Sequence, residues 1–145
     1  MSKKISIKDS IALVSGANRG IGKAITEELL NKGIKKVYAG ARKLESLTEL
    51  KEKYGDRLEL VQLDVTNQAS VDNAAKLASD ATMLINNAGV LAHGGYKSEN
   101  MLDSINQNME VNVLGVARLT QAVLPNIENK PNATIATVSS VVGLG

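Results

Sequence analysis

The chain has no cysteine, phenylalanine or tryptophan, and it contains a single histidine among its 145 residues. The absence of cysteine excludes disulfides and cysteine-ligated metals, and His93 has no second histidine with which to share a metal ion. No apolar run approaches the roughly 18 residues of a membrane span. The apolar run that follows the N-terminal lysines is too short for a signal peptide. We therefore expect a cytoplasmic protein with no metal site and no membrane partner.

Charges of the two signs are nearly balanced along the chain. The sequence has 17 Lys and Arg against 15 Asp and Glu, interspersed to a net charge of +2. This excludes the concentrated basic surface of a nucleic-acid-binding protein. The hydrophobic content of 43% is enough for the core of one domain. Because Phe and Trp are absent, that core must be aliphatic.

The most informative stretch is a short apolar strand at residues 11–14 that runs into three glycines and then into an amphipathic helix. Gly16 permits a tight turn, Gly20 lets the backbone approach a pyrophosphate, and Gly22 lets the helix lie close to the sheet. The first amide groups of the helix would face the phosphates. Alternatively, the glycines only close an ordinary strand-to-helix connection. The predicted cofactor contacts of this turn are Gly16, Asn18, Arg19, Gly20, Ile21 and Gly22.

Segments that predict strands alternate with segments of helical periodicity along the whole chain. This alternation is typical of an α/β, Rossmann-like fold with a doubly wound parallel sheet and helices on both faces. The implied strand order is 3-2-1-4-5. We expect strands at residues 11–14, 36–40, 58–65, 82–86 and 133–139, and helices from 21 to about 33 and at 44–53, 70–78 and 101–124. Further expectations are that Leu44, Leu47 and Leu50 share one side of the second helix, Asn67 caps the third, and Pro125 ends or caps the fourth.

Two motifs give the sequence a more specific resemblance. Three residues separate the first two glycines of the turn and one separates the last two, whereas the usual Rossmann fingerprint has one and then two. The sequence Asn86-Asn87-Ala88-Gly89 ends the fourth predicted strand. With these motifs the chain resembles the short-chain dehydrogenase/reductase superfamily over nearly its whole length, with Ser15 where that family more often has Thr. The resemblance implies an oxidoreductase that transfers hydride between a nicotinamide cofactor and a small-molecule carbonyl or alcohol.

Cofactor choice depends on the end of the second strand, where NAD-binding proteins usually carry an acid for the ribose 2′-hydroxyl. The sequence has no acidic residue between Glu28 and Glu45, but it has Arg42 there and Arg19 in the glycine turn. Guanidinium groups bind phosphate in a bidentate geometry, so the two arginines favour NADP (NADPH). Alternatively, each arginine taken alone is an ordinary solvated surface residue. Members of the resembling family that prefer NADP carry basic residues at these two places.

Further candidates for cofactor binding end the third and fourth strands. Asp64 lies where a carboxylate at the carboxyl edge of the sheet can accept from the adenine amino group, or it merely caps the following turn. In the resembling family, an Asp-Val pair at the place of Asp64 and Val65 meets the adenine. The side-chain amides of Asn86 and Asn87 are expected to pin the strands together and to line the cofactor ribose. Asn87, Ala88 and Gly89 are the candidates for cofactor binding in this motif.

Two residues are candidates for the reaction itself. Asn112 interrupts an apolar part of the long predicted helix, which by itself indicates a surface position or a local kink. Its segment 110–115 nevertheless resembles the family segment whose Asn organises a water chain to the catalytic Lys. Ser140, in the pattern Ser-Val-Val-Gly, resembles the family's catalytic serine and would hold the substrate carbonyl oxygen. We expect His93 to be an exposed loop residue.

The family's proton donor is a Tyr four residues before a Lys, roughly a dozen residues beyond the Ser, and no such pair occurs in this chain. We therefore interpret residues 1–145 as one dinucleotide-binding domain that is incomplete at its C-terminus and inactive alone. A second hypothesis is a non-catalytic nucleotide-binding module, either a regulator or a half completed by another chain. Because the strand at 133–139 would leave an unpaired edge, we expect a homo-oligomer or a complementing C-terminal chain.

Overall fold

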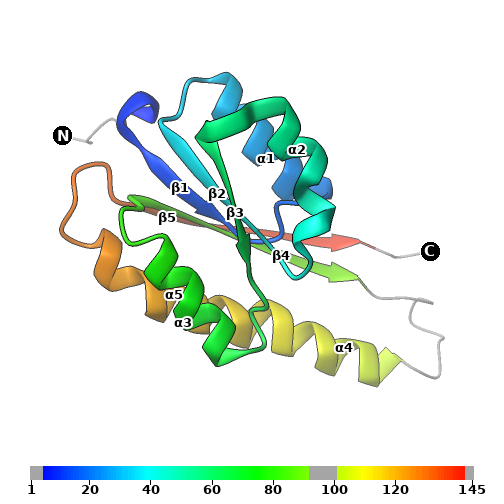
Figure 1. The fold of residues 1–145 in the computed structure, drawn as a ribbon. Helices are drawn as coiled ribbons and strands as arrows, with labels where there is room; N and C mark the ends of the chain where they lie inside the picture. Colours follow the sequence, from blue (N-terminus) through cyan, green and yellow to red (C-terminus); the bar gives the residue numbers. More distant parts are fainter. Residues whose placement is uncertain (1–4, 92–100, 143–145) are drawn as a thin grey trace.

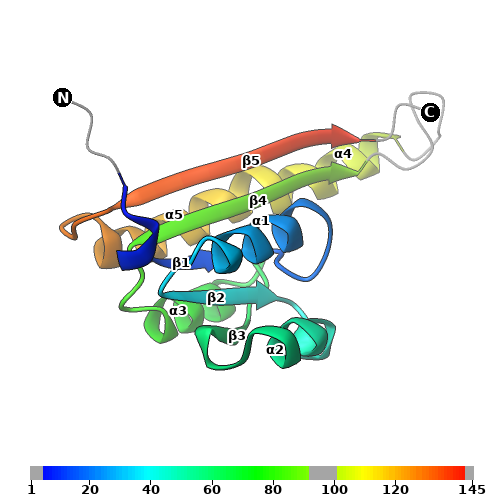
Figure 2. The ribbon, with the colours of Figure 1, turned by 90° about the horizontal axis from the view of Figure 1, so that it is seen from above.

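Five parallel strands form the sheet at the centre of the computed structural model, which describes residues 5–91 and 101–142. The strands are β1 (Ile11–Val14), β2 (Lys36–Ala41), β3 (Leu58–Gln62), β4 (Met83–Leu91) and β5 (Thr134–Val142). Their spatial order is β3-β2-β1-β4-β5, as Figure 2 shows from above. The predicted fold class and strand order are therefore confirmed.

Helices cover both faces of the sheet (Figure 1). One face carries α1 (Gly20–Asn31) and α2 (Thr48–Tyr54), and the other carries α3 (Gln68–Leu77), α4 (Met101–Met109) and α5 (Gly115–Ile127). Each face buries its own apolar cluster, because successive side chains of a strand point to opposite sides. Ala12 and Val14 of β1 pack in the cluster under α1 and α2, whereas Leu13 packs in the cluster under α3 and α5.

One tyrosine is the exception to an otherwise aliphatic core. Among the described residues, Tyr38 of β2 is the one aromatic side chain in the buried core, at 4% exposed. Its hydroxyl donates to Asp80 Oδ1 at 2.6 Å and accepts from Lys36 Nζ at 3.1 Å. Burial is the largest cause that raises the pKa of Tyr38, and the hydrogen bond to Asp80 acts in the same direction. The ring therefore stays neutral while its hydroxyl is satisfied at the surface of the core.

The third strand is shorter than predicted. β3 ends at Gln62 rather than at Val65, because the chain makes a turn in which Asn67 N donates to Asp64 O at 3.0 Å. The predicted cap of the next helix is confirmed, since Oδ1 of Asn67 accepts from Ser70 N at 3.0 Å. The turn thus leads directly into α3.

The fourth and fifth strands are longer than predicted. β4 continues past Asn86 to Leu91, and β5 continues past Ser139 to Val142. The two strands stay in parallel register throughout, so that Leu91 lies opposite Val142. The prediction that residues 86–89 end the strand is therefore wrong, because pairing with β5 extends β4 beyond its apolar segment.

The long predicted helix at 101–124 is divided into two α-helices by a π-helical turn at Glu110–Leu114. Pro125 does not end the helix but lies inside α5. Val123 and Ile127 are buried, so packing on the core holds the last turn despite the donor that proline lacks. Within the described part of the chain, no helix has the length and apolar character needed to cross a membrane.

The second predicted helix also begins differently. Residues Leu44–Leu47 form a 3₁₀ turn, and α2 follows from Thr48. Leu47 and Leu50 are buried, whereas Leu44 is 41% exposed. The expectation of one helix from Leu44 that carries the three leucines on one side is therefore wrong, because a 3₁₀ turn precedes α2 and its Leu44 is not buried with the other two.

Candidate functional site

The predicted site lies at the carboxyl edge of the sheet, between β1 and β4. From β1 the sheet extends outward through β2 and β3, and from β4 it extends outward through β5. The connections after β1 and β4 therefore leave the sheet toward opposite faces. In open α/β sheets such a point forms a ligand-binding crevice. The glycine turn after β1 and the segment 86–89 of β4 meet here.

Hydrogen bonds from both neighbouring strands fix the glycine turn. On one side, Ala17 N donates to the carbonyl oxygen of Gly40 in β2 at 2.9 Å. On the other side, Asn87 of β4 donates through its backbone N–H to Ser15 Oγ at 3.0 Å and through Nδ2 to Gly16 O at 3.3 Å. The turn is thus held in place before any ligand binds.

The three glycines of the turn are required for different steric reasons. Gly16 and Gly20 have φ angles of +62° and +58°, which is left-handed backbone that favours glycine. A Cβ at Gly22 would overlap the carbonyl oxygen of Gly16 and lie 2.7 Å from Asn87 Nδ2. A Cβ at Gly20 would meet no heavy atom within 4 Å, so open space lies beside that backbone. The turn is therefore tight at Gly22 and open at Gly20.

The N-terminus of α1 emerges from this open side. Arg19 is the N-cap residue with extended backbone (φ −160°), and no side chain caps the helix at this position. The first turn of α1 contains no acidic residue. Uncapped amide groups at a helix N-terminus carry partial positive charge and attract anions. The predicted contacts Asn18, Gly20 and Ile21 lie in this segment, so the structure brings the glycine-turn candidates together.

Asp64 caps its own turn, as the alternative interpretation of the sequence allowed. Its Oδ1 accepts from Thr66 N at 2.9 Å and from Thr66 Oγ1 at 2.6 Å. These hydrogen bonds are the main cause that lowers the pKa of Asp64, and the positive charge of Arg42 lowers it further. Arg42 follows β2 and Asp64 follows β3, so the two candidates lie near each other. Arg19 and Arg42 are both exposed.

Val65 and Asn112 come from segments that pack together. Asn112 is half-buried in the π-helical turn, which is the local irregularity that its apolar neighbourhood indicated. Gly115, just after that turn, approaches Val65 so closely that a Cβ would lie 2.6 Å from Val65 Cγ2. The predicted adenine loop and the turn of Asn112 are therefore neighbours.

Ser140 is placed by the register of the two long strands. It lies in β5 opposite Gly89, while Ser139 lies opposite Ala88. The backbone of Ser140 is thus two pairs further along the β4–β5 ladder than Asn87. His93 lies outside the described residues.

Three groups in or beside the site were not identified from the sequence as functional. The hydroxyl of Ser15 accepts a hydrogen bond from the backbone N–H of Asn87. Gly40 lies so close to its surroundings that a Cβ would be 2.8 Å from Leu63 Cδ2. The sequence could have indicated this close approach, because a glycine within an apolar strand often marks one. The third group is the ion pair between Arg118 and Glu110, which no local pattern in the sequence indicates.

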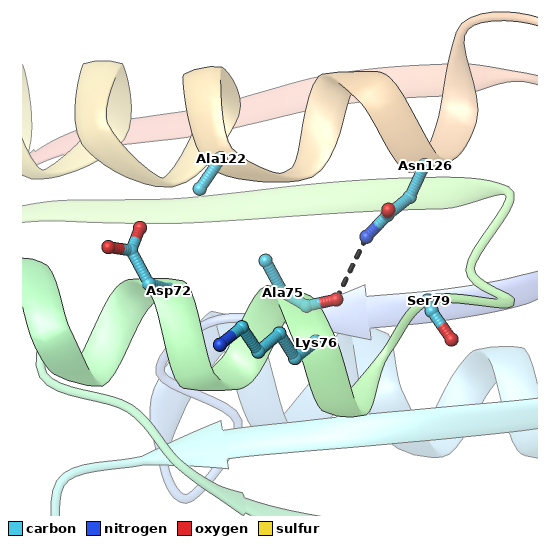
Figure 3. A pocket seen from close by; sticks show the side chains of 6 residues that line it. All are labelled: Asp72, Ala75, Lys76, Ser79, Ala122 and Asn126. Atoms are coloured by element: carbon cyan, nitrogen blue, oxygen red, sulfur yellow. Dashed lines mark hydrogen bonds between the residues drawn. The ribbon is translucent and has the colours of Figure 1, made fainter.

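A hollow between α3 and α5 lies apart from these residues (Figure 3). In it, Asn126 Nδ2 donates to the carbonyl oxygen of Ala75 at 2.9 Å, which ties the two helices together. The carboxyl ends of helices that return between parallel strands lie at the amino edge of the sheet, opposite the glycine turn. The residues that line the hollow are Asp72, Ala75, Lys76, Ser79, Ala122 and Asn126.

The sheet, its switch point and its glycine turn define a Rossmann-like α/β protein, and comparison with known proteins identifies the family. A family model described as short chain dehydrogenase matches residues 10–145. The chain belongs to the short-chain dehydrogenase family.

Curated relatives and solved structures agree with this assignment. NADP-dependent 3-hydroxy acid dehydrogenase YdfG of Escherichia coli O6:H1 is 34% identical over 137 residues, which are 92% of this chain and 55% of the relative. 3-Oxoacyl-[acyl-carrier-protein] reductase FabG of Vibrio cholerae is 34% identical, over 96% of this chain and 58% of the relative. The chain therefore spans about half the length of the curated relatives it matches.

Two solved structures were determined with different cofactors. A short chain dehydrogenase from Burkholderia cenocepacia J2315 in complex with NADP matches with a TM-score of 0.78 and 35% identity, over 93% of this chain and 54% of that chain. A 3-ketoacyl-(acyl-carrier-protein) reductase from Brucella melitensis complexed with NADH matches with a TM-score of 0.74 and 27% identity, over 83% of this chain and 51% of that chain. Similarity alone therefore leaves the choice between the two cofactors to the residues of the site.

Proposed function

We propose that this chain binds NADP at the glycine turn and forms the cofactor-binding part of an oxidoreductase. The observation that carries the proposal is the uncapped N-terminus of α1 behind two left-handed glycines, with open space at Gly20. This arrangement suits a pyrophosphate, because backbone amides can approach the phosphate oxygens and the helix dipole favours their charge. The bonds from Asn87 keep the turn in this form without a ligand.

Each part of the cofactor has its own set of proposed contacts. The pyrophosphate lies against the glycine turn, the adenine against the loop after β3, and the ribose against β4. The residues proposed for these three places are Gly16, Asn18, Arg19, Gly20, Ile21 and Gly22; Asp64 and Val65; and Asn87, Ala88 and Gly89.

The preference for NADP over NAD rests on Arg42 and Arg19. Both guanidinium groups are exposed, and Arg42 lies near enough to Asp64 to lower its pKa. A 2′-phosphate beside the adenine ribose would meet this positive charge, whereas the acid that would bind a 2′-hydroxyl is absent from the sequence. The relative YdfG is named NADP-dependent, which agrees with this choice.

The proposed reaction transfers hydride between the nicotinamide and the carbon of a small-molecule carbonyl or alcohol. The nicotinamide supplies or accepts the hydride. Ser140 would donate a hydrogen bond to the substrate oxygen and stabilise the charge that develops there. Asn112 would hold a water on the route by which a proton reaches that oxygen. Serine is a poor acid at neutral pH, so we propose that residues 1–145 alone bind NADPH without turning it over.

The proposal also includes how the protein assembles and where in the cell it lies. Residues 1–145 form one dinucleotide-binding domain that works with a complementing C-terminal chain segment or in a homo-oligomer. We place the protein in the cytoplasm.

The test of the cofactor assignment is a fluorescence titration with NADPH and NADH. We expect NADPH to bind more tightly than NADH. Arg42→Asp should weaken NADPH binding by about 10- to 100-fold, as for the loss of charged hydrogen bonds worth roughly 1.5–3 kcal/mol. Lys35→Asp is the matched control, because this exposed lysine precedes the same strand at the opposite edge of the sheet. Equal affinities for both cofactors, unchanged in Arg42→Asp, would contradict the preference.

The test of the reaction follows NADPH absorbance with a panel of ketones and quinones. Residues 1–145 and the chain extended through its C-terminal reading frame are compared at equal concentration. We expect turnover only for the extended chain. Turnover by residues 1–145 alone would show that the proton donor lies within them.

A further inference from the structure

Arg118, near the start of α5, joins two segments that the proposed function assigns to different parts of the site. Its Nη2 lies 2.7 Å from Oε1 of Glu110, in the π-helical turn. Its Nη1 donates to the carbonyl oxygen of Val65 at 3.2 Å. The side chain of Arg118 is 27% exposed, so both interactions are partly shielded from water. A guanidinium can serve both partners because its nitrogens point in different directions, whereas an ammonium is a single point charge.

The same two segments are also in direct contact through Gly115. A Cβ at this buried position would lie 2.6 Å from Cγ2 and 3.0 Å from Cβ of Val65. Val65 in turn packs against the apolar cluster under α3 and α5. The loop 64–67 therefore cannot move away from α5 without losing both this contact and the hydrogen bond from Arg118.

The π-helical turn itself depends on contacts outside its backbone. π-Helical geometry is rare and occurs mostly as single turns within α-helices, frequently at functional sites. Glu110 opens the turn, and Arg118 lies in the first turn of α5 beyond it, so their ion pair spans the irregularity. Removing the extra residue of such a turn would rotate the preceding side chains by about 100° relative to α5, because an α-helix has 3.6 residues per turn. Asn112 would then face a different direction.

We propose that Arg118 is a positioning residue that, together with Glu110, fixes the π-helical turn of Asn112 against the adenine loop 64–67. The inference rests on the proposed function, in which this loop holds the adenine and Asn112 serves the reaction. The guanidinium thereby couples the loop proposed to hold the adenine to the turn of Asn112. Arg118 thus acts through its two partners.

Amide hydrogen exchange without cofactor, on the chain extended through its C-terminal reading frame, tests the contact itself. Arg118→Met keeps the aliphatic stem but removes both polar interactions, so exchange should increase in loop 64–67 and in turn Glu110–Leu114. Glu110→Gln should increase exchange in the turn alone. Arg57→Met is the matched control, because Arg57 also donates to two backbone carbonyl oxygens, those of Leu30 in α1 and of Ile34 just after it. Unchanged exchange in both segments of Arg118→Met would overturn the proposal.

Steady-state kinetics and NADPH titration of the same variants test the role in the reaction. Arg118→Met should weaken NADPH binding by about 3- to 10-fold and lower kcat by between about 10- and 100-fold, as for a misplaced reacting group. Glu110→Gln should lower kcat while the Kd for NADPH stays within twofold. Arg118→Lys should recover kcat more than affinity, because its single ammonium reaches Glu110 without also serving Val65.

The outcomes separate the two proposals. If Arg118→Met left both kcat and Kd within twofold of the unsubstituted protein, the positioning role would be wrong while NADP binding stood. If the unsubstituted protein bound no NADPH, the proposed function and the positioning role would both fall. Hydrogen exchange would in that case still decide whether Arg118 holds the two segments together.

Discussion

The side-chain amide of Asn87 donates a hydrogen bond to the carbonyl oxygen of Gly16 across 3.3 Å, and thereby ties β4 to the turn after β1. The backbone N–H of the same residue donates to Ser15 Oγ at 3.0 Å. Together with the bond from Ser15 N to the carbonyl oxygen of Ile85 at 3.1 Å, these bonds connect the fourth strand to the glycine turn at the switch point of the sheet. Asn87 therefore shapes the glycine turn through contacts within the protein.

The first prediction follows from this contact. Asn87→Ala should weaken NADPH binding by about 3- to 10-fold, because a neutral hydrogen bond contributes roughly 0.5–1.5 kcal/mol and the turn loses part of its preorganisation. Fluorescence titration measures the change. Asn126→Ala is the matched control, since Asn126 also donates to a backbone carbonyl but lies between α3 and α5. Equal effects of the two substitutions on the Kd would contradict a specific role for Asn87.

The second prediction concerns the close approach at Gly22. In Gly22→Ala the new methyl group would overlap the carbonyl oxygen of Gly16 and crowd Asn87 Nδ2. Overpacking against backbone that is fixed on both sides should lower the free energy of unfolding by about 2–3 kcal/mol. Denaturation in urea measures the loss, and NADPH binding should be impaired as well. A variant as stable as the parent would show that the turn yields easily.

Gly20 provides a different test, because its backbone is left-handed but its surroundings are open. Gly20→Ala should lower the free energy of unfolding by about 1–2 kcal/mol through backbone conformation alone. It should also weaken NADPH binding, since a methyl group would occupy the space proposed for the pyrophosphate. Gly55→Ala is the control: Gly55 has φ +61° and equally open surroundings, but it lies after α2. Gly55→Ala should lower the free energy of unfolding and leave the affinity for NADPH unchanged.

The sequence predicted the sheet because the apolar strands and the glycine turn are local signals. It did not predict how far β4 and β5 extend, because that depends on pairing between strands that are far apart in the chain. Asn86 illustrates the difficulty. It looks like the end of an apolar strand, yet it is 1% exposed and its Nδ2 donates to Thr120 Oγ1 at 3.0 Å. The packed α5 supplies this partner for Nδ2, which the sequence around Asn86 does not reveal.

The helices from 101 to 127 show the same limit of prediction from sequence. The apolar spacing from 101 to 124 continues through the π-helical turn, so periodicity alone predicts one helix. The ion pair of Glu110 and Arg118 spans eight positions, which is outside the three- and four-residue spacing that sequence patterns use. The tight turn and the close approach at its glycines could be predicted because these steric demands fall within seven consecutive positions. The packing of the loop 64–67 against α5 required the tertiary structure.

The fourth prediction concerns the edge of the sheet. Among the described strands, β5 pairs with β4 alone, and Ile135 on it is 39% exposed. Unpaired edges associate, so residues 1–145 should show concentration-dependent association in sedimentation velocity. Ile135→Lys should reduce it, because a charged side chain on an edge strand opposes pairing. Leu77→Lys is the control, since Leu77 is 53% exposed at the end of α3. A dilute, stable monomer of the unsubstituted chain would contradict the prediction.

The last prediction concerns the pH dependence of stability at the loop 64–67. Hydrogen bonds from Thr66 lower the pKa of Asp64, chiefly the one from its hydroxyl. A carboxyl whose pKa is lower in the folded than in the unfolded state stabilises the fold above its unfolded pKa of about 3.9, and this contribution is lost as the pH falls through the folded value. Thr66→Val removes the hydroxyl and keeps the backbone N–H. It should therefore lower the free energy of unfolding at pH 7 by about 0.5–1 kcal/mol.

The difference between the parent and Thr66→Val should shrink as the pH falls below about 4, because protonated Asp64 no longer depends on the hydroxyl as a donor to its charge. Urea denaturation at pH 7 and at about pH 3 measures both differences. Thr48→Val is the matched control, because the exposed Thr48 hydroxyl donates to the carbonyl oxygen of Glu45 at 3.0 Å, and that acceptor does not titrate. Its effect on stability should be the same at both pH values. If Thr66→Val behaved like Thr48→Val, the hydroxyl of Thr66 would not be what holds the pKa of Asp64 down.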